Sequence, residues 1–131
     1  NYRCGTGHSV SFVGNVHEGP HALNGRNTTL MRPGMIVTDE PGVYETDLVG
    51  IRIENELVCV HKADNQYGTF LGFEPIMFVP IATSPIVPGV LTNDELDWLN
   101  NYHRQVFEKL APRLNDEERE WLAKKCAAIG C

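Results

Sequence analysis

Apolar and polar residues alternate along residues 50–60, which gives this stretch the clearest strand pattern in the chain. Successive side chains of a strand point to opposite faces, so alternation predicts a strand with one apolar face and one polar face. We predict a single strand here, with the isoleucines on one face and the charged side chains on the other. The charged side chains are those of Arg52, Glu54 and Glu56. The apolar end of the strand, residues 57–60, is expected to be buried on both faces.

Shorter apolar runs predict further strands, at residues 35–38, 43–45, 70–73 and 76–79. Turn-forming residues separate these runs, notably Pro41-Gly42 and the segment 65–68. Residues 19–34 are rich in Gly, Pro and Asn and are predicted to form a loop. Residues 80–90 contain three prolines and are predicted to be an extended connector.

The pattern changes to helical spacing after residue 91. Thr92 followed by Glu95 is a capping box, which satisfies free backbone N–H groups at the start of a helix. Apolar residues then recur every three or four positions, as in an amphipathic helix, and Pro112 ends it. The members of this stripe are Leu96, Leu99, Tyr102, Val106 and Leu110. A second helix is predicted to start near Asn115. Strands followed by two C-terminal helices indicate an α+β fold.

Composition excludes several classes of function. The formal net charge of the 131 residues is −6, which argues against a nucleic-acid partner. No run of about 18 apolar residues is present, so no membrane span is predicted. The four cysteines show no CxxC spacing, which favours reduced thiols and a cytoplasmic location. The first residues, Asn1-Tyr2-Arg3, are expected to belong to the interior of a longer protein.

Histidine and acidic residues in three Gly-bounded phrases form a candidate cation site. The residues are His8, Glu40 and Glu54. One imidazole with several carboxylates suits Mn²⁺, Zn²⁺ or Co²⁺ more than Cu⁺, and a pair of such ions can hold a hydroxide nucleophile. By type and spacing alone the alternatives stay open. The glutamates also fit solvated strand-edge charges, and Arg52 also fits a simple partner for a buried acid.

The surrounding phrases together resemble Xaa-Pro aminopeptidase, a metallopeptidase of the M24 family with the "pita-bread" fold. They are Gly5-Thr6-Gly7-His8, Asn15-Val16-His17-Glu18-Gly19-Pro20, the segment from Pro33 to Gly42, and Gly50-Ile51-Arg52-Ile53-Glu54-Asn55. The tail around Asp97-Trp98-Leu99 is similar to the C-terminal extension of the long form of this enzyme. The resemblance covers nearly the whole chain but only the second half of the fold. It implies that residues 1–80 belong to the catalytic domain and that residues 81–131 form the C-terminal extension.

The resemblance implies two divalent ions, Mn²⁺ or Zn²⁺, and a peptide substrate with proline in second position. It makes His8 and Glu40 metal ligands, Glu54 a ligand that bridges both ions, and His17 a catalytic group beside the substrate. Arg52 would orient neighbouring carboxylates. The family commonly has a histidine where this chain has Cys4, and substrate binding there is expected to differ because a thiol donates hydrogen bonds poorly. Ser9 and Ser11 also replace family glycines.

Two Asp ligands and another catalytic His of the family belong to the first half of the fold and have no counterpart in these residues. We therefore expect this chain alone to bind at most one ion and to be inactive. Exposed strand edges predict a homodimer. Two alternatives remain: a prolidase of the same fold, against which the Trp98–His103 extension argues, and a non-catalytic binding module, against which the retained ligand types argue.

Overall fold

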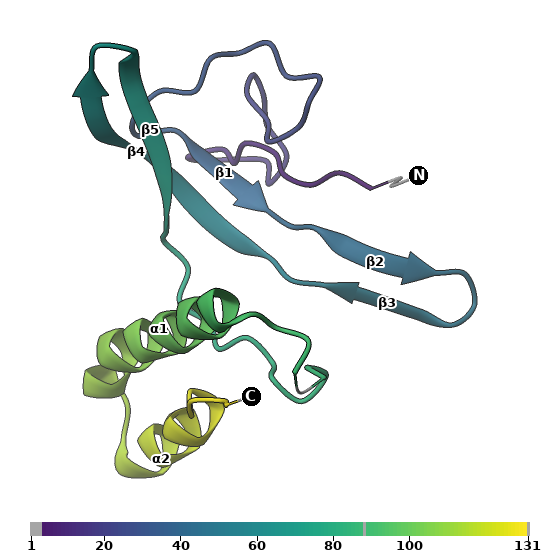
Figure 1. Cartoon of the computed structure of the whole chain (residues 1–131), viewed down its shortest axis with the longest axis vertical. Helices are drawn as coiled ribbons and strands as arrows, with labels where there is room; N and C mark the ends of the chain where they lie inside the picture. The colour runs from purple at the N-terminus through teal and green to yellow at the C-terminus, as the bar shows by residue number, and fades with distance from the viewer. Residues whose placement is uncertain (1–3, 88, 131) are drawn as a thin grey trace. The chain divides into compact units, whose positions relative to one another are not determined.

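The structure is a computed structural model that describes residues 4–87 and 89–130. The chain divides into two compact units, Asn1–Met77 (unit 1) and Phe78–Cys131 (unit 2). Unit 1 contains the strands and unit 2 contains the helices, as Figure 1 shows. The α+β class predicted from the sequence is therefore confirmed.

Unit 1 is built from antiparallel strands. In its larger sheet, β4 (Asn55–Asn65) lies between β1 (Ile36–Asp39) and β5 (Gly68–Pro75). A separate hairpin is formed by β2 (Gly42–Glu45) and β3 (Val49–Arg52), which project as a long ribbon in Figure 1. Most of the predicted strands and turns are thus confirmed, and all the strand pairs are antiparallel.

The prediction of one continuous strand over residues 50–60 was wrong. β3 ends at Arg52 and β4 begins at Asn55, because the chain changes its pairing partner between them. β3 pairs with β2 and β4 pairs with β1, and Pro41 separates β1 from β2. Pro41 has no N–H to donate to the ladder, while its carbonyl accepts the N–H of Ile53 at 3.3 Å. The break therefore follows from a proline on the neighbouring chain segment, which alternation within 50–60 does not reveal.

Burial along this segment also differs from the prediction. The isoleucines predicted to form the apolar face are exposed, Ile51 at 49% and Ile53 at 52%. In the run expected to be buried on both faces, only Cys59 is fully buried. The predicted strand at 76–79 is likewise absent: the N–H of Ile76 continues the ladder to the carbonyl of Glu56, and unit 2 begins two residues later.

The N-terminal segment 6–9 lies alongside β1 in an arrangement that the sequence did not predict. The amide N–H of Thr38 donates to the carbonyl of His8 at 2.9 Å, and that of Glu40 donates to the carbonyl of Thr6 at 2.8 Å. On its other side the segment pairs with residues 21–23. These bonds hold the Gly-Thr-Gly-His phrase against β1, which leads directly into Glu40-Pro41-Gly42.

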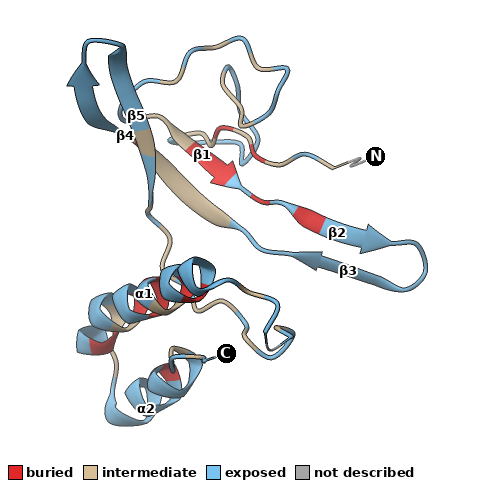
Figure 2. Cartoon of the chain, in the orientation of Figure 1, coloured by how far each residue is buried: buried red, intermediate tan, exposed pale blue. Residues whose placement is uncertain are grey.

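Unit 2 is a helical pair with its own small core. Helix α1 (Asn93–Leu110) begins with the predicted Thr92 capping box, and α2 (Asp116–Lys125) begins with a second one at Asn115. The core cluster contains Tyr102, Val106, Ala111 and Leu122. Figure 2 shows the buried residues of the two helices as red bands. Among the described residues, no helix is both long enough and apolar enough to cross a bilayer.

Two polar side chains of α1 bind the backbone of the segment 79–81. Tyr102 Oη donates to the carbonyl of Val79 at 2.9 Å. His103 is fully buried, and its Nε2 accepts the N–H of Ile81 at 3.1 Å. His103 directly follows Tyr102 of the apolar stripe, so the helical period places it at the edge of the buried face.

The buried position of His103 predicts a pH dependence of unit 2. Burial lowers the pKa of His103 below its ordinary value of 6.5. Below pH 6.5 the imidazole of the unfolded chain binds a proton, whereas the buried imidazole of the folded chain does not. Unit 2 should therefore be fully stable above about pH 6.5 and should lose stability as the pH falls below 6.5. His103 is the single histidine, and Trp98 and Trp121 are the two tryptophans, in residues 78–131. Urea unfolding followed by tryptophan fluorescence should therefore give a lower midpoint at about pH 5.5 than at about pH 7.5.

The matched control is His103→Gln, whose side-chain oxygen can still accept the N–H of Ile81 but does not titrate. Its unfolding midpoint should change little between the two pH values. An equal pH dependence in both proteins would contradict the assignment to His103.

Candidate metal centre

Glu40 is the centre of a buried polar cluster in unit 1. It follows directly after β1 and is only 8% exposed. Its Oε1 lies 3.0 Å from His8 Nε2 and accepts a hydrogen bond from Thr38 Oγ1 at 2.9 Å. Its Oε2 contacts Arg52 Nη1. A carboxylate that is buried must be compensated by such partners, so the cluster fixes both oxygens of Glu40 in direction.

The imidazole of His8 has the orientation that is typical of a metal-binding histidine. Its Nδ1 lies 2.9 Å from the carbonyl of Ser9, and because a carbonyl can only accept, Nδ1 carries the proton. In the neutral ring Nε2 then bears a lone pair, which faces Glu40 Oε1. Two acceptors cannot bond each other, so this pair requires either a second proton on the ring or a shared cation. Backbone hydrogen bonding of the remote nitrogen is the usual support of a metal-binding histidine.

The distance between the two groups fits a shared divalent ion. Ligand bonds of about 2.1 Å at about 90° place two ligand atoms roughly 3.0 Å apart. The observed separation of His8 Nε2 and Glu40 Oε1 is 3.0 Å. The donor set of these two residues therefore suits a metal ion without rearrangement of the two side chains.

Arg52 and Tyr44 extend the cluster into the β2–β3 hairpin. Arg52 Nε donates to Tyr44 Oη at 2.6 Å while the same guanidinium contacts Glu40. The guanidinium also lies 5.7 Å from the centre of the Tyr44 ring. Arg52 was singled out from the sequence, but Tyr44 and Thr38 were missed. Thr38 lies two residues before Glu40. Tyr44 lies on β2, and the pairing of β2 with β3 brings its hydroxyl within reach of Arg52.

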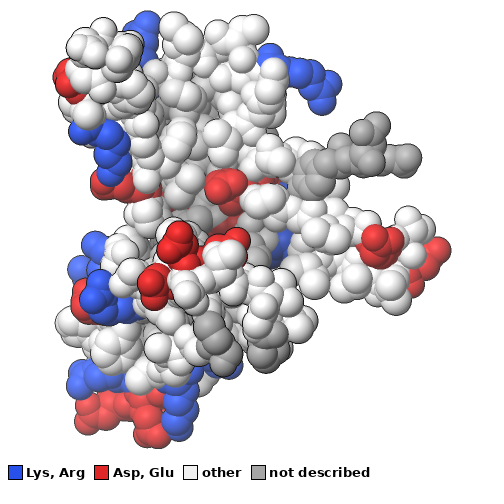
Figure 3. Space-filling view, viewed as in Figure 1, with Lys and Arg blue, Asp and Glu red and all other residues white. Residues whose placement is uncertain are grey.

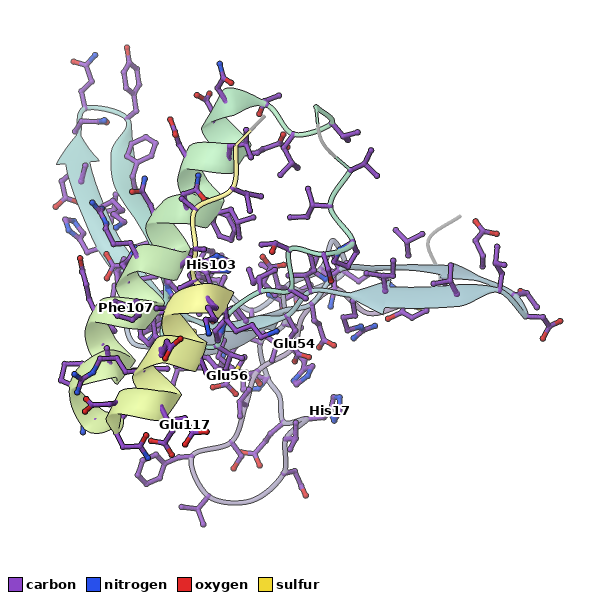
Figure 4. All side chains as sticks on the ribbon, turned by 90° about the horizontal axis from the view of Figure 1, so that it is seen from below. His17, Glu54, Glu56, His103, Phe107 and Glu117 are labelled. Carbon is purple, nitrogen blue, oxygen red and sulfur yellow. The ribbon has the colours of Figure 1, made fainter. Side chains whose placement is uncertain are left out.

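His17 and Cys4 lie close to His8 in the sequence, on either side of the segment 6–9. The ring of His17 is exposed and its centre is 4.1 Å from that of His8, so the structure brings these two predicted site residues together. Figure 4 labels His17 in its loop. Cys4 is a partly buried free thiol four residues before His8.

Glu54 is not part of this cluster. It lies in the two-residue link between β3 and β4, exposed to solvent, rather than in the middle of a strand as predicted. In the described part of the chain no three His, Cys, Asp or Glu side chains are grouped so that they could hold a metal ion. The structure thus brings together His8, Glu40, His17 and Arg52 but leaves the third predicted ligand apart.

The side chain of Ser9 gives a test of how the segment is packed. Ser9 is 2% exposed, and its Oγ has no hydrogen-bond partner among the described residues. Because a buried unpaired hydroxyl opposes folding, Ser9→Ala should leave the free energy of unfolding unchanged or raise it by about 1 kcal/mol. Urea unfolding monitored by far-UV circular dichroism would measure this, and a loss of about 1 kcal/mol or more would mean that the hydroxyl has a partner.

The chain is similar to proteins of a known metallopeptidase family along most of its length. Residues 1–61 match the model of metallopeptidase family M24, and residues 69–129 match that of the C-terminal region of peptidase M24. The chain belongs to metallopeptidase family M24. It is 47% identical to aminopeptidase P2 of Arabidopsis thaliana, over 92% of this chain and 18% of that protein. It is 43% identical to aminopeptidase P1 of Lotus japonicus, over 98% of this chain and 20% of that protein.

A solved structure has the same fold. This is the X-prolyl aminopeptidase from Caenorhabditis elegans, described as a cytosolic enzyme with a di-nuclear active site. The match has a TM-score of 0.82 at 39% identity and covers 95% of this chain and 21% of that one. The M24 chain described here thus has part of the pita-bread fold of a prolyl aminopeptidase and spans about a fifth of the length of the relatives it matches.

Proposed function

We propose that these residues form the C-terminal part of a dinuclear metalloaminopeptidase that hydrolyses the bond between an N-terminal residue and proline. The observation that supports this most strongly is the pair formed by His8 Nε2 and Glu40 Oε1, 3.0 Å apart. The pair lies in two phrases of the chain that resemble Xaa-Pro aminopeptidase. The names of the relatives support the substrate class, and the di-nuclear active site of the Caenorhabditis elegans enzyme supports the number of ions.

Each site residue has a distinct role in this proposal. His8 and Glu40 would hold one ion, and Glu54 would bind from the β3–β4 link once the remaining ligands of the longer protein complete the site. Arg52 balances the charge of Glu40 and fixes the direction of its second oxygen. His17, beside His8, would donate a hydrogen bond to the substrate as charge develops on its carbonyl oxygen. Cys4 would contact the substrate side of the site as a weak donor.

When bound, two divalent ions polarise the substrate carbonyl and supply an activated water for attack. The imidazole and carboxylate ligands suit Mn²⁺ or Zn²⁺. In this proposal residues 1–80 would supply catalytic groups and residues 81–131 would form the helical C-terminal extension. The cytosolic relative and the free thiols of Cys4, Cys59 and Cys126 support a cytoplasmic enzyme.

The test is an assay of the full-length protein that contains this segment. With Mn²⁺ or Zn²⁺ it should release the first residue from an Xaa-Pro-Xaa peptide and leave the Xaa-Ala-Xaa analogue intact. Turnover of the Xaa-Pro dipeptide alone would indicate a prolidase, and no turnover of any of these substrates would contradict the proposal. The 131-residue chain by itself should show no turnover, because two Asp ligands expected from the family are not among its residues.

We also propose self-association through the β2–β3 hairpin. The hairpin exposes Val43 at 66%, Leu48 at 80% and Ile51 at 49%, and Figure 3 shows its surface largely uncharged apart from its acidic tip. Exposed apolar strands of this kind favour an interface. Light scattering of the full-length protein should give a dimer mass that Leu48→Lys lowers toward the monomer, whereas a monomeric wild type would contradict it.

A further inference from the structure

The hydroxyl of Thr38 joins the backbone of one candidate ligand to the carboxylate of the other. Thr38 lies in β1 and is 2% exposed. Its Oγ1 accepts the backbone N–H of His8 at 3.0 Å and lies 2.9 Å from Glu40 Oε1. Both contacts are made by a single oxygen in a buried setting, where a hydrogen bond that is lost cannot be replaced by water.

The direction of these two bonds follows from the chemistry of the groups. A backbone N–H only donates, so it uses a lone pair of Oγ1. A carboxylate only accepts, so the single proton of the hydroxyl points to Glu40. Thr38 therefore holds Glu40 Oε1 on the side of His8 and leaves Oε2 to Arg52. Valine at this position would fill the same space but would leave the His8 N–H and one carboxylate lone pair unpaired.

The same residue also fixes His8 through the main chain. The N–H of Thr38 donates to the carbonyl of His8 at 2.9 Å, so His8 is bound to Thr38 through both of its backbone polar groups. Gly7 passes directly over the Thr38 carbonyl. Strand β1 thus sets the position of the His8 backbone, and the Thr38 hydroxyl links that position to the rotamer of Glu40.

We propose that Thr38 is a positioning residue for the metal site: its hydroxyl sets the separation of His8 Nε2 and Glu40 Oε1 that a common divalent ion requires. The inference rests on the proposed function, because it takes His8 and Glu40 as ligands of one ion. It extends that function to a residue that contacts neither the ion nor the substrate.

The test compares Thr38→Val, which keeps the volume, with Thr38→Ser, which keeps the hydroxyl, in the full-length protein. Titration with Mn²⁺ against a fluorescent chelator should give a dissociation constant about 10- to 100-fold weaker for Thr38→Val. Thr38→Ser should stay within about threefold of the wild type, because it restores both hydrogen bonds. Equal affinity of Thr38→Val and the wild type would overturn the proposal, and so would a loss of 10-fold or more in Thr38→Ser.

A second measurement needs neither metal nor catalysis. In the 131-residue chain, amide hydrogen exchange at His8 should be faster in Thr38→Val and unchanged in Thr38→Ser, since only the former removes the acceptor. Unchanged exchange in Thr38→Val would overturn the proposal. The failure of this proposal is distinguishable from the failure of the proposed function. If the wild type cleaves Xaa-Pro peptides and Thr38→Val binds Mn²⁺ as tightly as the wild type, only the role of Thr38 is refuted. If the wild type neither binds metal nor cleaves these peptides, the proposed function is refuted.

Discussion

Gly7→Ala is expected to separate the N-terminal segment from β1 and to destabilise unit 1 by about 3 kcal/mol. A Cβ atom at Gly7 would lie 2.1 Å from the carbonyl oxygen of Thr38 and 2.8 Å from Cβ of Leu23. Neither neighbour is the flexible end of a long side chain, so the segment itself must move. Movement breaks the pairing of residues 6–9 with β1, and with it the placement of His8 beside Glu40.

The measurement is hydrogen exchange by mass spectrometry on the 131-residue chain, read at the amides of Thr38 and Glu40, which bond this segment. Both should exchange faster in Gly7→Ala. Gly5→Ala is the matched control, because a Cβ at Gly5 meets no atom within 4 Å. Protection at β1 that is equal in Gly7→Ala, Gly5→Ala and the wild type would show that the segment does not depend on this close approach.

Glu40→Gln is expected to lower Xaa-Pro peptidase activity of the full-length protein by more than about 100-fold. The substitution keeps the shape of the side chain but removes its charge and one of its acceptor oxygens. Arg52 then faces a neutral amide, and His8 loses the anionic group with which it would share an ion. The loss should appear in kcat and in the metal content of the purified protein together.

Asp39→Asn is the control for this substitution. Asp39 is the preceding residue on β1, and its side chain is exposed, so the change removes the same charge without touching the cluster. Its activity and metal content should remain within about twofold of the wild type. A Glu40→Gln protein that keeps two ions and near-normal kcat would show that Glu40 is a structural partner of Arg52 rather than a ligand.

The sequence predicted the elements of this fold better than their connections. Local signals suffice for α1 and α2, since capping boxes at Thr92 and Asn115 act within one turn of the helix. The break at residues 53–54 could not be read from the alternation around it. It depends on Pro41, which lies between β1 and β2 on the neighbouring chain segment and interrupts the strand ladder there.

The candidate site, too, could be predicted only in part from the sequence. His8, Glu40, His17 and Arg52 were predicted because each belongs to a phrase that resembles a known family. Thr38 lies within the phrase from Pro33 to Gly42, but its residue type and position in the sequence did not indicate its hydrogen bond to Glu40. Tyr44 lies outside these phrases and reaches Arg52 through the pairing of β2 with β3. Glu54 was expected to be held rigidly in a strand, yet it lies in a link whose neighbours among the described residues do not bury it.

The central claim is that this M24 segment supplies ligands to a two-metal site. The most direct measurement is the metal content of the full-length protein by inductively coupled plasma mass spectrometry, for the wild type and for His8→Ala. We predict two divalent ions per chain in the wild type and at most one in His8→Ala. A wild type that holds no ion pair, or a His8→Ala protein that still holds both ions, would contradict the claim.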